Sequence, residues 1–118
     1  MQEKVFIIAK DFAKSPGPRF IKEGPNSAEK LMNDRLRSLF SQVVHSNERL
    51  KIDLDGTTGY ATSFLEATFG GLAREFGPTV VLDHISIKSE KVPDYAEESI
   101  SYINEVKDRS TSTLHTNS

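Results

Sequence analysis

The stretch that most constrains the fold of this chain runs from Asp53 to Glu66 and reads Asp-Leu-Asp-Gly-Thr-Thr-Gly-Tyr-Ala-Thr-Ser-Phe-Leu-Glu. Apolar residues alternate with charged ones up to Leu54, which predicts a half-buried strand. The two glycines that follow indicate a turn. Ser63 and Glu66 then form the Ser-x-x-Glu pattern of a capping box, which predicts the start of a helix. The stretch therefore predicts a strand, a turn and a helix in direct succession.

Three helices are predicted from apolar residues that recur at steps of three and four. The first carries its apolar stripe over residues 28–44, after the possible N-caps Asn26 and Ser27. The second runs from about residue 63 to residue 76, where Gly-Pro ends it. The third starts at Pro93, since proline suits the first turn of a helix.

Four strands are expected from apolar or alternating runs, at residues 5–9, 19–22, 50–54 and 84–88. The second would pair antiparallel with the first, and residues 80–82 fit either a helical turn or a strand start. Helices that alternate with strands imply crossover connections and a partly parallel sheet. The predicted fold class is thus α/β, with a mixed sheet of about four strands packed against about three helices.

Composition limits the domain count and the function. The 118 residues suggest one domain over residues 1–108, followed by a polar and flexible tail over residues 109–118. Lys and Arg number 15 against 17 Asp and Glu, which argues against a nucleic-acid binder. Cysteine is absent, so disulfides and thiolate metal sites are excluded. The polar start and the lack of a long apolar run predict a cytoplasmic protein without a membrane partner.

Three sequence blocks, together with the order of the elements, resemble the STAS fold, and more closely the STAS-like family of small bacterial proteins. The blocks are Pro16-Gly-Pro-Arg19, Gly24-Pro-Asn-Ser27 and the long run from Asp53 to Gly71. The resemblance extends from about Ile7 to Val106. It implies a regulatory protein-interaction module. No cofactor is expected.

The better-known STAS proteins, the anti-sigma factor antagonists, have an Asp-Ser-Ser-Gly stretch whose second serine is phosphorylated by a kinase that is also the binding partner. The matching positions here are Thr62 and Ser63, with Ala61 and Phe64 in place of the flanking aspartate and glycine. The resemblance therefore implies partner switching with a histidine-kinase-like ATPase at the start of the second helix. Ser63, or Thr62, would be the phosphoacceptor.

Exposed side chains at this turn would give the partner its contact surface. Tyr60 and Phe64 would form an apolar patch there beside Glu66, unless one of the rings packs into the core. The alternative for Ser63 is a structural one: its hydroxyl would only cap the helix, which contributes about 1 kcal/mol. Both readings of Ser63 remain open from the sequence, and the capping role is the simpler.

A second candidate site lies before the first helix. A glycine bend that enters a helix can bind an anion, so Arg19, Asn26 and Ser27 are candidate anion-binding residues. They would make the chain a sensor of a small anion or nucleotide. The alternative is a capped helix with a solvated arginine.

Acidic residues and histidines give little support to a metal or catalytic site. Asp53 and Asp55 could hold Mg²⁺, but no third ligand is identifiable and Asp-Gly is a common turn pair. His45, His84 and His115 show no metal-ligand spacing and provide no recognisable base for Ser63. No metal site and no enzymatic activity are expected.

Overall fold

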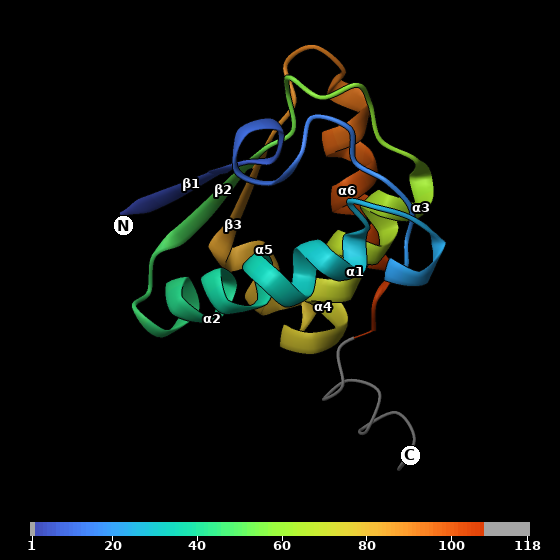
Figure 1. Ribbon diagram of the computed structural model, residues 1–118. Coiled ribbons are helices and arrows are strands. Elements are labelled where there is room, and N and C mark those ends of the chain that lie inside the picture. Colours follow the sequence, from blue (N-terminus) through green and yellow to red (C-terminus); the bar gives the residue numbers. More distant parts are fainter. Residues whose placement is uncertain (1, 108–118) are drawn as a thin grey trace.

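The computed structural model describes residues 2–107 (Figure 1). The predicted domain boundary at residue 108, the predicted tail and His115 lie outside the described residues. The strands are β1 (Glu3–Ile7), β2 (Arg49–Asp53) and β3 (Ile85–Lys88). The helical elements, in chain order, are η1 (Ile8–Phe12), η2 (Ile21–Glu23), α1 (Ala28–Leu31), η3 (Met32–Leu36), α2 (Arg37–His45), α3 (Thr62–Leu65), η4 (Glu66–Gly70), α4 (Gly71–Phe76), α5 (Pro78–His84) and α6 (Pro93–Glu105).

The described sheet has three parallel strands in the order β1-β2-β3. Phe6 lies beside Ile52 of the central strand, and Ile52 lies beside Ile87. Leu50 and Ile52 are buried, whereas their neighbours along β2 are only half-buried. Right-handed crossovers between strands that follow one another in this order place both connections on the same face. The helices between the strands therefore cover one face of the sheet. The other face carries Lys51 and Ser86 beside Val5, which is exposed.

Two long helices dominate the covering layer. Helix 28–45 combines α1, η3 and α2, and helix 62–76 combines α3, η4 and α4, each with a π-helical turn in its middle. Their apolar stripes fill the core with Leu31, Leu36 and Phe40 from the first helix and Leu65, Phe69 and Leu72 from the second. Phe40 and Phe76 meet edge to face, with ring centroids 4.9 Å apart, a favoured aromatic geometry.

Most predicted elements are confirmed. The α/β class holds, the strands near residues 50–54 and 84–88 are present, and the three predicted helices appear at 28–45, 62–76 and 93–105. The first strand ends at Ile7, two residues earlier than predicted. Its last backbone N–H donates to the carboxylate of Asp11, 2.8 Å away, and the chain then coils into η1.

The predicted strand at residues 19–22, and with it the four-stranded mixed sheet, is wrong. Ile21–Glu23 forms the short 3₁₀ turn η2 instead. The backbone N–H of Phe20 donates to Glu23, and that of Ile21 donates to Glu29, so neither amide is free to join a sheet. Two carboxylates nearby in the sequence thus satisfy the amides that a strand would have used.

The ambiguous residues 80–82 belong to α5, which Pro78 starts directly after helix 62–76. The structure therefore has more helical segments than the three expected. Within residues 2–107, none of the helices combines the length and the apolar character needed to cross a membrane.

Replacing Phe40 by alanine should remove its edge-to-face contact and leave a cavity between the long helices. We expect Phe40→Ala to lower the free energy of unfolding by about 3–5 kcal/mol, measured by urea denaturation. Ser41→Ala, at the exposed neighbouring position, should change it by less than about 0.5 kcal/mol. A loss below about 1 kcal/mol for Phe40→Ala would contradict the packing described here.

Candidate functional site

The predicted docking segment begins with a turn that two glycines make possible. Gly56 and Gly59 have φ values of 91° and 128°, which residues with a Cβ rarely adopt. Tyr60 follows and turns inward: its hydroxyl donates to the carbonyl of Leu54 at 2.9 Å. Its ring contacts those of Phe64 and Tyr95, with centroids 5.7 and 5.1 Å away. The turn is thus fixed to the core and to α6.

The predicted apolar contact patch at this turn is wrong for Phe64, which is 1% exposed and belongs to the core. Tyr60 is half-buried, and burial raises the pKa of its hydroxyl well above the ordinary value. The tyrosine therefore remains a neutral hydrogen-bond donor at physiological pH. The two rings anchor the turn, and of the two only Tyr60 is partly exposed.

The predicted capping box is also wrong. Ala61 is the N-cap of α3, and no side chain caps this end. Thr62 is therefore the first helical residue and is exposed, whereas Ser63 lies within the first turn and is half-buried. The carboxylate of Glu66 is bound elsewhere, which leaves none to reach back toward the first turn. Both candidate phosphoacceptors lie at the surface end of the helix, and Thr62 is the more accessible.

Glu66 sits between two arginines from different parts of the chain. Arg19 donates to one carboxylate oxygen at 2.5 Å, and Arg74 donates to the other at 2.7 Å. Burial opposes ionisation of Glu66, but hydrogen bonds from Arg74 and Arg19 outweigh it, so that the pKa of Glu66 lies below its usual value. Two guanidinium groups share one carboxylate, which gives the cluster a net charge of +1.

Gly70 makes room for this cluster on the surface of helix 62–76. Glu66, Gly70 and Arg74 are four residues apart and share one helix face. A Cβ on Gly70 would lie 2.7 Å from Glu66 Oε2 and 3.0 Å from a nitrogen of Arg74. The second glycine, Gly71, lies toward Met32 of the other long helix. Gly70 therefore leaves space for the Glu66–Arg74 ion pair, and Gly71 lies at the contact between the two long helices.

The three candidate anion-binding residues have separate roles. Ser27 is buried and caps α1, since its hydroxyl accepts the N–H of Lys30 at 3.0 Å. Asn26 donates from its side chain to the carbonyl of Ser15. Arg19 extends to Glu66 on the other long helix. Ser27 thus confirms the cap of the alternative reading, whereas Arg19 is ion-paired rather than only solvated. An anion site built from all three residues stays a prediction.

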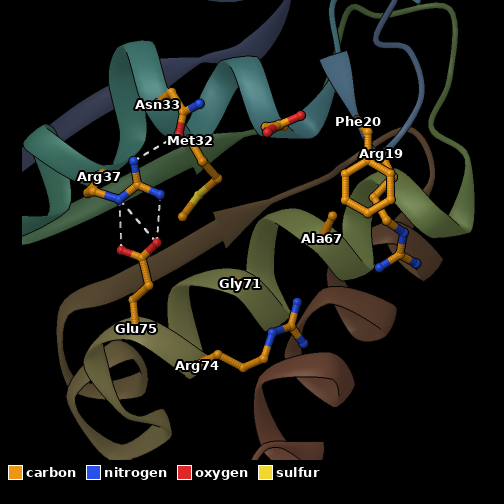
Figure 2. A pocket seen from close by; sticks show the side chains of 10 residues that line it. Arg19, Phe20, Met32, Asn33, Arg37, Ala67, Gly71, Arg74 and Glu75 are labelled. Atoms are coloured by element: carbon orange, nitrogen blue, oxygen red, sulfur yellow. Dashed lines mark hydrogen bonds and ion pairs between the residues drawn. The ribbon is translucent and has the colours of Figure 1, made fainter. Parts of the chain in front are cut away.

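A surface hollow of about 330 Å³ lies between helix 28–45 and helix 62–76 (Figure 2). Met32, Ala67 and Gly71 line its apolar part, and Phe20 stands at one end. At the other end, Arg37 binds both carboxylate oxygens of Glu75 and also donates to Asn33. The arrangement places an exposed aromatic ring directly beside an apolar depression with charged ends.

Asp53 and Asp55 organise the loops at the carboxyl ends of β2 and β3. Asp53 accepts the N–H of Asp55, and Asp55 accepts those of Glu90 and Lys91, both at 3.0 Å. These two backbone donors hold the pKa of Asp55 below its usual range. Both carboxylates thus have the structural role that the turn interpretation expected. Within residues 2–107, no three His, Asp or Glu side chains gather in a way that could hold a metal.

The histidines show no arrangement for catalysis in the part of the chain that the structure describes. The ring of His84 lies 2.8 Å from the carbonyl of Glu48, and His45 is exposed on α2. No hydrogen bond found within residues 2–107 joins a histidine to Ser63. A serine nucleophile would need such a base.

Sequence reasoning missed two features of this surface. One is the exposure of Phe20 and Ile21, which are exposed by 46% and 53%. It was missed because the predicted strand would have placed both residues in the sheet. The cluster around Glu66 was missed because Arg19 lies 47 residues away. The four-residue spacing of Glu66, Gly70 and Arg74 was the one available signal for half of it.

Substituting Glu66 tests the cluster through its pH dependence. A lowered pKa in the folded state adds stability above the unfolded value of about 4.3, and this contribution disappears as the pH falls through the folded value. We expect Glu66→Gln to lower the free energy of unfolding at pH about 7, and the difference from wild type to shrink toward zero below about pH 4. Urea denaturation across this range measures it. A difference that stays constant, or grows in acid, would contradict the account.

Comparison with known families identifies the chain. The family model described as "STAS-like domain of unknown function (DUF4325)" matches residues 27–95. This match covers both long helices, β2 and β3. No curated protein and no solved structure matches significantly. With more than half of its residues matched by the model, the chain belongs to this family of STAS-like domains.

Proposed function

We propose that this STAS-like domain is a regulatory protein-interaction module that acts without catalysis and binds its partner at the first turn of helix 62–76. At the level of the family, a STAS-like domain suggests a regulatory module, and the matched residues include this turn. The observation that carries the proposal is the exposure of Thr62, which is the first helical residue and follows exposed Ala61 at the uncapped end of the helix.

The rigidity of the turn supports a binding role. The inward-facing ring of Tyr60 holds the backbone before the helix, through its hydrogen bond to Leu54 and its contact with Tyr95. A surface that is ordered before binding loses less conformational entropy when the partner arrives. The partner therefore meets Ala61, Thr62 and the exposed part of Tyr60 in a fixed arrangement.

Phosphorylation of Thr62 or Ser63 would act on the neighbouring ion cluster. Thr62 lies four residues before Glu66, so both side chains lie on one helix face. A phosphate on Thr62 adds a charge of about −1.5 to −2, which repels Glu66 and attracts Arg19. The modification would thus weaken the Arg19–Glu66 ion pair and change the surface to which the partner binds. A cytoplasmic, histidine-kinase-like ATPase of a bacterial cell is the partner class that fits this switch.

The small-ligand alternative has less support. Its three candidate residues are divided between a helix cap, a loop contact and an ion pair. A sensor for a small anion or nucleotide would need to displace at least one of these contacts. The interaction module needs no such rearrangement.

Charge mimics at the first turn test the proposal. Thr62→Glu and Ser63→Asp should weaken binding of the kinase-like ATPase by about ten-fold or more, equivalent to at least about 1.4 kcal/mol. Thr62→Ala and Ser63→Ala should bind as wild type does. Affinity purification from the native cell identifies the ATPase, and calorimetry with the purified protein gives the Kd.

Ser41→Asp is the matched control, because Ser41 is an exposed hydroxyl on α2 away from the first turn. It should leave the Kd unchanged. If all five variants bind alike, or no ATPase of this class binds the wild-type domain, the proposed function is wrong.

A further inference from the structure

The face formed by the two long helices carries a projecting apolar pair next to a depression. Phe20, the N-cap of the turn η2, and Ile21, its first residue, are called the ridge below and are both about half exposed. The hollow described above lies on one side of Phe20, and a second depression of about 470 Å³ lies around Phe20, Ile21 and Lys22.

A ridge beside a hollow is complementary to a second copy of itself. In a two-fold symmetric pair, each surface patch contacts the same patch on the other protein, so a projection in one copy can enter a depression in the other, and the reverse. The ring of Phe20 would then lie on Met32, Ala67 and Gly71 of the other copy. These side chains are apolar or small, which leaves room for a ring (Figure 2).

The charges around the hollow are balanced, which also favours a second copy over a strongly acidic or basic partner. They are Arg19, Arg37 and Arg74 against Glu29, Glu66 and Glu75. Arg37 and Glu75 neutralise each other. Arg19 and Arg74 share one carboxylate, while Glu29 has no ion-pair partner within residues 2–107 and accepts the N–H of Ile21.

The Glu66 cluster and Glu29, which accepts the N–H of Ile21 beside the ridge, carry charges of opposite sign. The Glu66 cluster carries one unneutralised positive charge, and Glu29 carries one unneutralised negative charge. Two copies related by a two-fold axis can place each Glu29 against the other copy's Arg19 and Arg74. The net charge of the chain is only −2, so repulsion between whole molecules is small.

We propose that this face is the interface of a symmetric homodimer, in which Phe20 of each copy enters the hollow of the other. The dimer buries the ridge and leaves the first turn of helix 62–76, with Thr62, as the surface for a different partner. It goes beyond the proposed function, which requires no self-association.

Sedimentation analysis of the full chain between about 1 µM and 1 mM tests the dimer directly. Wild type should show a concentration-dependent dimer. Phe20→Ser removes the ridge and Ala67→Glu fills the hollow, and each should raise the dimer Kd by about ten-fold or more. Val5→Ser is the matched control, because Val5 is 56% exposed on the edge strand β1 and should leave the Kd unchanged.

Mixing the two defective variants provides a second readout. A pair of one Phe20→Ser chain and one Ala67→Glu chain keeps one intact ridge and one intact hollow that face each other. The mixture should therefore form more dimer than either variant alone. Circular dichroism melts of each variant confirm that the chains remain folded.

Three outcomes would overturn the proposal. One is a wild-type chain that stays monomeric over the whole concentration range. Another is a dimer that Val5→Ser weakens as much as Phe20→Ser does. The third is a mixture of Phe20→Ser and Ala67→Glu that dimerises no better than its components.

Discussion

The carboxylate of Glu66, held between the guanidinium groups of Arg19 and Arg74, is the contact on which the surface of this domain depends. Residues 13–27 contribute no strand to the sheet. They are held by the backbone contacts of Pro18 and Arg19 with the start of α1, by the bond from the N–H of Thr58 to the carbonyl of Lys14, and by this ion pair with the other long helix. The pair therefore connects a loop that carries no regular strand to the helix that carries Thr62.

Both proposed surfaces lie next to that contact. Thr62 precedes Glu66 by one helical turn, and Phe20 follows Arg19 directly in the chain. A change of charge at the first turn thus acts on the same pair that positions the exposed ring of Phe20. The arrangement would give a physical route between the two proposed interactions, since both surfaces adjoin the Arg19 segment.

The periodic elements of the fold were predictable from the sequence, because burial on one face leaves a repeating pattern. The apolar stripe over residues 28–44 and the alternation up to Leu54 each describe one element that contacts the core along its length. The family resemblance carried by Asp53 to Gly71 is confirmed by the match over residues 27–95. Pro93 and the Gly-Pro after residue 76 marked helix limits through the restricted geometry of proline.

The errors arose where side chains compete for partners across the chain. Residues 19–22 look like a strand, but Glu23 and Glu29 take the amides that a strand would use. Ser63 and Glu66 have capping-box spacing, yet two guanidinium groups bind the carboxylate more strongly than one backbone N–H would. A local sequence pattern shows which hydrogen bonds a side chain such as Glu66 could form. Which bond it forms depends on residues distant in the sequence, such as Arg19.

A double-mutant cycle on Arg19 and Glu66 tests the central claim most directly. Urea denaturation at pH about 7 gives the free energy of unfolding of wild type, Arg19→Gln, Glu66→Gln and the double variant. If the pair connects the loop to helix 62–76, the two single losses should exceed the double loss by about 0.5–1 kcal/mol. Losses that add to within about 0.3 kcal/mol would contradict the account.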